Sequence, residues 1–170
     1  MFTKNFMPFA AANMFGGGTA NLNCMIVKTD GTRQGYFGSG TTVYKMMSEV
    51  VKSTTGSLHG VIFTNGTTPP TPDDLTYTGT MLTNYTCAVT VGVTQDENGA
   101  KCTGLYTITN AGDTDFTVSE ICLFSHAYKS STNNSGYFML ERTVLEEPVT
   151  LPPNGVAVIT YTIRLNFPPR

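Results

Sequence analysis

The strongest constraint on the fold is a strict alternation of apolar and polar residues on both sides of a turn-forming segment at residues 96–99. This period of two residues is typical of a β-strand, because successive side chains point to opposite faces of a sheet. A hairpin closed at this segment has one apolar or glycine-bearing face, with the opposed pairs Gln95 and Ala100, Val93 and Cys102, Val91 and Gly104, Val89 and Tyr106, and Cys87 and Ile108. The other face carries Thr90, Thr94, Lys101, Thr103, Thr107 and Thr109. The sequence therefore predicts an antiparallel hairpin in this register with one buried face.

Similar apolar segments, bounded by turn-forming residues, follow one another along the rest of the chain. Further strands are expected at residues 21–30, 59–63, 116–125, 137–145 and 156–165, with a turn at residues 151–155. About seven or eight β segments with a turn signal roughly every ten residues are typical of a β-sandwich or jelly roll. We therefore predict an all-β fold with a single β-sandwich domain at residues 21–170, since 170 residues suffice for one domain with a core of its own.

Two segments depart from the strand pattern. Between Val43 and Val51 the apolar residues fall at the spacing of one helix face, which predicts a short amphipathic helix at residues 42–53. Three prolines within residues 65–75 remove backbone donors and exclude a strand there. That segment is expected to form an ordered loop or a single helical turn, capped by Asp73 or Asp74.

The first 20 residues contain aromatic residues and methionines without a stable period, and three consecutive glycines stand near their end, at residues 16–18. This composition predicts an extended N-terminal arm. Large exposed apolar side chains favour a contact partner, so we expect Phe2, Phe6, Phe9 and Phe15 to dock on a neighbouring subunit or on the arm's own domain. The alternative is a frayed terminus.

Charge is sparse in this chain. Charged residues make up 13% of the sequence, against about 25% in a typical soluble domain, and the net charge is −2. The ten lysines and arginines are scattered, so a cationic surface for phosphate groups is not expected, and direct nucleic-acid binding is disfavoured. A partner chain can cover such a surface without desolvating many charged groups, and desolvation of charges is the most costly part of burying a contact. The low charge content therefore favours a subunit that partner chains cover.

Neither a membrane-spanning apolar run nor a signal-peptide pattern is recognisable, which predicts synthesis in the cytoplasm. The four cysteines, Cys24, Cys87, Cys102 and Cys122, stand singly in apolar surroundings and are expected to be reduced thiols. The hairpin register separates Cys87 from Cys102 by several rungs, which excludes a disulfide between them. The sequence predicts no metal and no cofactor.

Candidate catalytic groups do not form a constellation in the sequence. His59 and His126 lie in no motif, and the carboxylate pairs at residues 73–74 and 146–147 border proline turns, where capping explains them better than acid–base chemistry. Two charges stand out, Glu120 and Arg142, because apolar residues flank each of them on both sides. A lone buried charge is prohibitive, so we predict a structural ion pair between Glu120 and Arg142, or with backbone groups, across adjacent strands.

Several motifs, in order, resemble those of phage and prophage virion proteins. They are the Gly-Thr-Thr-Pro-Pro-Thr-Pro loop at residues 66–72, Thr-Ile-Thr-Asn at 107–110, Ser-Glu-Ile-Cys-Leu-Phe at 119–124, Leu-Glu-Arg-Thr at 140–143, Leu-Pro-Pro-Asn-Gly at 151–155 and Thr-Tyr-Thr-Ile at 160–163. The likeness covers about residues 59–165, and it departs from the family pattern at Cys122, where glycine is expected. The resemblance implies a structural component of the capsid or tail, without catalysis.

These observations lead to a first hypothesis and one main alternative. The first is a non-enzymatic virion structural protein, a capsid-decoration, head-associated, connector or tail component, which contacts other virion proteins and copies of itself and binds neither membrane nor nucleic acid. The alternative is a receptor- or carbohydrate-binding module of a phage tail or fibre, in which the rings of Tyr36, Phe37, Tyr77, Tyr128 and Tyr137 would stack on sugars. The absence of tryptophan counts against the alternative. A hydrolase has no supporting residues.

Overall fold

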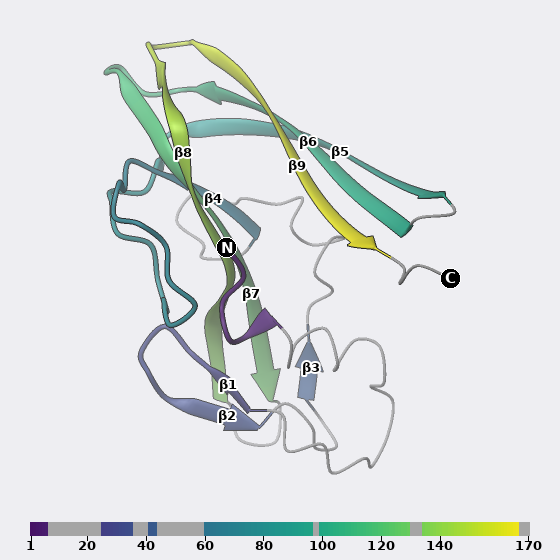
Figure 1. The fold of residues 1–170 in the computed structure, drawn as a ribbon. Coiled ribbons are helices and arrows are strands. Elements are labelled where there is room, and N and C mark those ends of the chain that lie inside the picture. Colours follow the sequence, from purple (N-terminus) through teal and green to yellow (C-terminus); the bar gives the residue numbers. More distant parts are fainter. Residues whose placement is uncertain (7–24, 36–40, 44–59, 97–98, 130–133, 167–170) are drawn as a thin grey trace. The chain divides into compact units, whose positions relative to one another are not determined.

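The computed structural model describes residues 1–6, 25–35, 41–43, 60–96, 99–129 and 134–166. The regular elements in these ranges are strands, so the all-β prediction is confirmed for the described part of the chain (Figure 1). The strands are β1 (Met25–Val27), β2 (Arg33–Gly35), β3 (Thr41–Val43), β4 (Gly60–Thr64), β5 (Tyr85–Asp96), β6 (Gly99–Asn110), β7 (Phe116–Lys129), β8 (Asn134–Leu151) and β9 (Val156–Asn166).

The chain divides into two compact units, each with its own sheet. The first unit comprises Met1–Thr83 and Thr117–Val149, and the second comprises Asn84–Phe116 and Thr150–Arg170. In the first unit β7 pairs antiparallel with both β3 and β4 and also pairs with β8, while β1 and β2 form a separate hairpin. In the second unit β5, β6 and β9 form a three-stranded antiparallel sheet.

The core of the first unit lies where β4, β7 and β8 meet. Every residue of β4 is buried, and so is every residue of β7 from Val118 to Ser125. Both faces of these two strands are covered, so apolar side chains occur on both faces and do not alternate regularly with polar ones. Buried residues from these three strands form one cluster, and Tyr77 and Met81 pack against it; its members are Ile62, Cys122, Phe124 and Met139.

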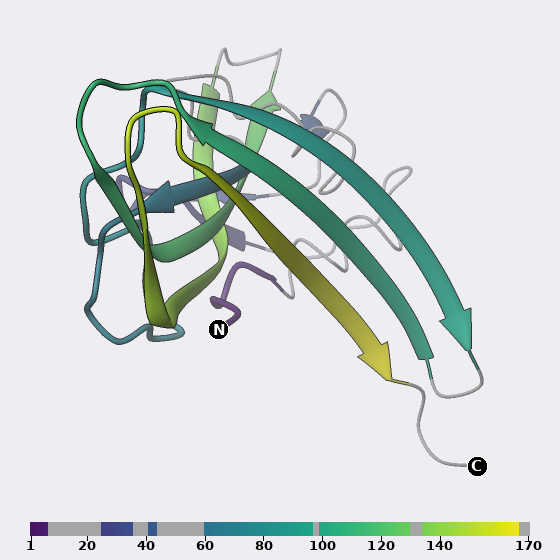
Figure 2. The ribbon, with the colours of Figure 1, turned by 90° about the horizontal axis from the view of Figure 1, so that it is seen from above.

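The sheet of the second unit confirms the predicted hairpin register. All five predicted pairs are present, and the ladder continues to Asp96 opposite Gly99, one pair beyond the expected turn boundary. On the other side of β6, β9 pairs without interruption from Val156 opposite Thr109 to Asn166 opposite Gly99. Figure 2 shows the three strands running side by side as long curved ribbons.

Three expectations need correction at element boundaries. The strand expected to run to Asp30 ends at Val27, since the Gly31 N–H donates to the Lys28 carbonyl at 2.9 Å and closes a turn there. Thr42 and Val43, the first residues of the expected helix, belong to strand β3, and residues 44–53 lie outside the described residues. β7 and β8 are longer than expected, and β8 continues through Pro148 to Leu151. Both strands stay extended past polar residues, because a ladder requires hydrogen-bonding backbone groups and not a particular side chain. A proline such as Pro148 is tolerated in a strand at a position where no ladder donor is needed.

Candidate functional site

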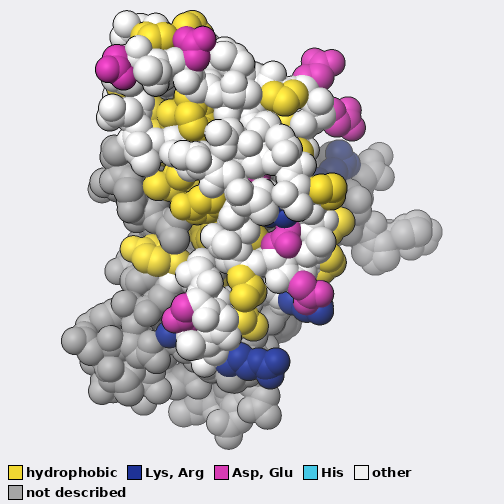
Figure 3. All heavy atoms as spheres, turned by 90° about the vertical axis from the view of Figure 1, so that its left-hand side faces the viewer, with side chains coloured by type: hydrophobic (Ala, Val, Ile, Leu, Met, Phe, Trp, Pro, Cys, Tyr) yellow, Lys and Arg dark blue, Asp and Glu magenta, His cyan; other side chains and the backbone are white. Residues whose placement is uncertain are grey.

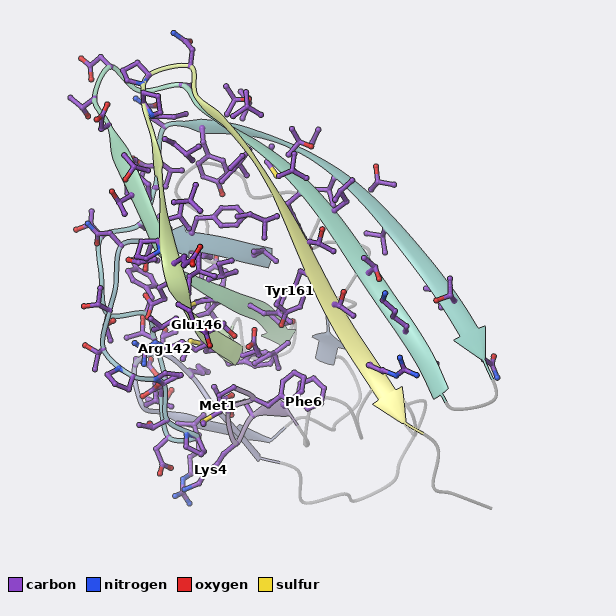
Figure 4. All side chains as sticks on the ribbon, turned by 45° about the horizontal axis from the view of Figure 1, so that its top comes forward. Met1, Lys4, Phe6, Arg142, Glu146 and Tyr161 are labelled. Atoms are coloured by element: carbon purple, nitrogen blue, oxygen red, sulfur yellow. The ribbon has the colours of Figure 1, made fainter. Side chains whose placement is uncertain are left out.

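Arg142 lies at the centre of the most extensive polar network in the described part of the chain. β7 and β8 are paired, and this pairing brings Glu120 of β7 to Arg142 of β8, the two residues that the sequence predicted as a pair. The Arg142 Nε atom donates a hydrogen bond to Glu120 Oε1 at 2.5 Å, and neither residue is exposed to solvent. Figure 4 marks Arg142 on β8.

The rest of the guanidinium group binds the proline-rich loop. Nη1 donates to Asp74 Oδ2 at 2.5 Å and to the Pro69 carbonyl at 3.4 Å. Nη2 donates to the Thr68 carbonyl at 2.6 Å and to Thr78 Oγ1 at 2.9 Å. We call this arrangement the Arg142 clamp; its members are Arg142, Glu120, Asp74, Thr64, Thr68, Pro69 and Thr78.

Glu120 holds the other side of the Arg142 clamp. Its carboxylate accepts hydrogen bonds from the Thr64 hydroxyl, from the Thr78 backbone N–H at 3.1 Å and from the Thr78 hydroxyl at 3.2 Å. Asp74 is oriented by Thr71, whose backbone N–H and hydroxyl both donate to its carboxylate at 2.7 Å. Asp74 therefore closes the turn at residues 71–74 and also anchors Arg142.

Electrostatics keep all three charged groups of the clamp ionised. Burial raises the pKa of Glu120, but hydrogen bonds from Thr64, Arg142 and Thr78 outweigh it, so the pKa lies below its usual value. Burial likewise raises the pKa of Asp74, and the hydrogen bonds from Thr71 and Arg142 bring it below the usual value. Burial lowers the pKa of Arg142, yet its bonds to Asp74 and Glu120 leave it raised.

Two glycines allow the loop to approach the clamp closely. A Cβ atom on Gly66 would lie 2.4 Å from Thr78 Oγ1 and 2.6 Å from Glu120 Oε2. A Cβ atom on Gly79 would lie 2.1 Å from the Gly66 backbone nitrogen. Neither glycine was predicted from the sequence; the available signal was the Asn-Gly pair at residues 65–66, a turn-forming dipeptide directly after a buried strand.

The arrangement of the Arg142 clamp suits a structural role better than catalysis. A guanidinium group has five N–H donors, and the clamp supplies five acceptors. No donor is left over to bind a substrate, and the side chain has no exposed surface. The clamp therefore fixes the loop at residues 65–78 to β7 and β8.

The N-terminal residues bind their own chain. Phe2 forms an isolated antiparallel bridge with Glu141 of β8, and the rings of Phe2 and Phe6 stack with centroids 3.9 Å apart. The Met1 amino group contacts Glu141 Oε1 at 2.8 Å (Met1 and Phe6 are marked in Figure 4). Phe9 and Phe15 lie outside the described residues.

Asn5 joins the N-terminal segment to two strands. Its amide nitrogen donates to the Val27 carbonyl at 2.8 Å and to the Met139 carbonyl at 3.2 Å, and its amide oxygen accepts from the Val27 N–H at 2.8 Å. Lys4 adds an ion pair with Asp73 of the proline-rich loop. The first six residues thereby connect β1, β8 and that loop within the first unit.

Asn110 plays a similar part in the second unit. Its side-chain nitrogen donates to the carbonyls of Thr114 at 2.8 Å and Leu151 at 2.9 Å, and its side-chain oxygen accepts from the Gly112 N–H at 2.9 Å. Its backbone pairs with Asn154 and Gly155 of the turn before β9. Asn110 is buried, and it was quoted above only as the last residue of a motif.

Exposed valines are concentrated on the sheet of the second unit. Val91 and Val93 of β5 are 37% and 73% exposed, and Val156 and Val158 of β9 are 59% and 60% exposed. Strand alternation places the β5 pair and the β9 pair on opposite faces of this sheet. The face of the molecule in Figure 3 shows acidic and basic side chains only in small separate groups among uncharged atoms.

The remaining candidates for chemistry gain no support from the described residues. No group of three or more metal-binding side chains occurs in the described ranges. Burial, with the charge of Glu120 second, strongly raises the pKa of the Cys122 thiol, which removes it as a nucleophile. Nothing is described of His59 or of the His126 side chain. Tyr77, one of the proposed sugar-stacking rings, packs edge-on against Phe124 of the core at 6.3 Å.

Comparison with known proteins identifies no relative. Searches of protein families, curated proteins and solved structures found no match to this chain. Among the described residues no helix is long and apolar enough to cross a membrane.

Proposed function

We propose that the chain is a structural subunit of a phage particle, a capsid-decoration, head-associated, connector or tail component that acts through protein–protein contacts and not through catalysis. The observation that carries the proposal is the sheet of the second unit, which exposes valines on both faces. Large exposed apolar side chains favour a surface that a partner covers. The resemblance of the ordered motifs to virion proteins agrees with this role.

The polar networks support the proposal because they fix surfaces without forming a reaction site. The Arg142 clamp and the Asn110 contacts use residues from the motifs that carry the resemblance, namely the proline-rich loop, the Ser-Glu-Ile strand, the Leu-Glu-Arg strand and the Thr-Ile-Thr-Asn strand. A rigid presentation of loops lowers the entropy that a contact must overcome. In this proposal the chain folds as a β-sandwich. It is made in the host cytoplasm and then incorporated into the virion.

The test is to look for the chain in assembled particles. Particles produced from the genome that encodes the chain are purified on a density gradient, and their proteins are quantified by mass spectrometry. We expect the chain in a fixed ratio to the major capsid protein, and cryo-electron microscopy is expected to place it in symmetric copies. Its absence from intact particles, with detection only in the soluble lysate, would rule the proposal out.

A further inference from the structure

We propose that β5 is a self-association edge, at which two copies of the chain pair their β5 strands antiparallel and join their sheets into one. The inference deepens the proposed function and rests on it, because it names a second copy of the chain as the partner of the exposed sheet. Three features of β5 support this contact: its backbone edge, its exposed valines and its charge pattern.

Among the described strands, β5 lies at the edge of its sheet. It pairs with β6 along residues 85–96 through consecutive partners, without a bulge, and no other strand of the described chain pairs with it. Proteins usually protect such edges with lysine, proline, bulges or short strands, because an open row of N–H and C=O groups templates further pairing. Residues 85–95 contain none of these devices. A long edge of this kind favours pairing with a further strand.

Val91 and Val93 give this edge an apolar side. Both lie on the same face of β5, and they are 37% and 73% exposed. Val89, on the same face, is half-buried. Pairing of a second strand along β5 would cover these side chains in addition to the backbone, so hydrogen bonding and apolar burial act at the same place.

The β5 sequence is complementary to itself. In an antiparallel pair centred on Val91, each copy's Val89 lies opposite Val93 of the other copy, and Thr90 lies opposite Gly92. Residues 85–95 carry no charge, and Asp96 falls opposite Thr86, so no like charges meet across the seam. Such a two-fold contact uses the same patch on both copies and closes after two chains.

β9 provides the internal comparison. It forms the other edge of the same sheet, and its exposed valines, Val156 and Val158, lie on the opposite face from Val91. It carries Arg164 within its length, whereas the charge of β5 stands at its last residue. Val158 is therefore a matched control for Val91, since both are exposed valines at an edge of one sheet.

The experiment measures self-association of the full chain by sedimentation velocity over a wide concentration range, under reducing conditions. We expect a reversible dimer whose Kd rises by about tenfold or more in both Val91→Lys and Val91→Asp, because each variant places like charges opposite one another. An equimolar mixture of the two variants is expected to restore the dimer. Val158→Lys should leave the Kd within about twofold of the wild-type value.

Circular dichroism of each variant verifies folding, and Val93→Lys replaces Val91→Lys if the latter does not fold. A wild-type chain that stays monomeric, or a dimer that Val158→Lys weakens and Val91→Lys does not, would overturn the inference. Its failure differs from failure of the proposed function: a monomer present in particles removes only the β5 contact, whereas a β5 dimer absent from particles removes only the virion role.

Discussion

Arg142 shows how one residue can organise a loop that has no regular structure of its own. Its guanidinium group is buried, and each of its five donors meets an acceptor, two of them on carboxylates. A buried charge pair adds little net stability compared with apolar residues, but the loss of one partner leaves the other uncompensated. The clamp is therefore better understood as a device that specifies the loop conformation.

Replacement of Arg142 should be strongly destabilising. We expect Arg142→Met to lower the free energy of unfolding by about 3–5 kcal/mol, because Glu120 would remain buried without its cation. Exposed Arg33→Met is the control, with a change within about 0.5 kcal/mol. Urea unfolding followed by circular dichroism measures both variants. A loss below about 1 kcal/mol in Arg142→Met would show that the clamp is not buried in solution.

The clamp also predicts a pH dependence of stability. The pKa values of Glu120 and Asp74 are lowered by folding from ordinary values of 4.5 and 3.8. Below these values the unfolded chain binds more protons than the folded chain, so stability falls as the pH falls through the folded-state pKa values, and the contribution is complete above the unfolded values. Urea unfolding from about pH 6 to about pH 3 should show this loss. Glu120→Gln should flatten the pH profile, and an unchanged profile in that variant would contradict the assignment.

Gly66 offers a test of close packing at the clamp. Gly66→Ala should lower the free energy of unfolding by about 1–3 kcal/mol, because its Cβ atom would press on Thr78 and Glu120. Gly92 is the matched control, since a Cβ atom there meets nothing within 4 Å. Gly92→Ala should be neutral or slightly stabilising. Thermal unfolding of both variants provides the comparison, and equal effects would argue against the close approach.

At the scale of elements, strands with a strict period were predictable and segments held by tertiary contacts were not. The β5–β6 register followed from alternation, because a slip by one residue would turn threonines toward the face on which Tyr106 and Ile108 are buried. The expectation that this whole face is buried was wrong at Val91 and Val93, which are exposed. The start of the expected helix failed at Thr42 and Val43, where pairing with β7 decides the conformation. Local apolar spacing carries no information on a distant partner strand. Thr42 pairs with Tyr128, 86 residues further along the chain.

The Asn110 side chain joins the end of β6 to neighbouring backbone groups. Asn110→Ala should lower the free energy of unfolding by about 2 kcal/mol, because the Leu151 and Thr114 carbonyls and the Gly112 N–H would lose their partner. Amide hydrogen exchange should quicken at Gly112 and at the turn containing Asn154. Protection that is unchanged at these amides would mean that the side chain does not hold the turn.

The turn itself was visible in the sequence. Asn154 has a positive φ of 61°, and the Gly155 N–H donates to the Pro152 carbonyl at 2.7 Å. Asparagine and glycine tolerate such turn geometry, which is why residues 151–155 could be predicted as a turn. The sequence did not indicate which side chain binds this turn, because Asn110 precedes Leu151 by 41 residues.

At the scale of the whole molecule, the low charge content has a consequence for assembly. The net charge is −2, and the proposed β5 seam carries no charge within residues 85–95. Self-association at this seam should therefore depend weakly on salt. We expect the dimer Kd to change by less than about threefold between about 0.05 M and about 0.5 M sodium chloride in sedimentation experiments. A steep weakening with salt would instead indicate an ion-paired contact.

The sequence by itself determined the all-β class, the hairpin register, the turn before β9 and the need to neutralise Glu120 and Arg142, because each of these follows from side-chain period or from the cost of burying a charge. Only the tertiary structure decided that the guanidinium group would hold the proline-rich loop through Asp74 and three further acceptors, and that Asn5 and Asn110 would bind distant backbone groups. Many polar groups along the chain could make hydrogen bonds of the same kind. The tertiary fold selects the pairs that form, because it alone brings particular groups within hydrogen-bond distance.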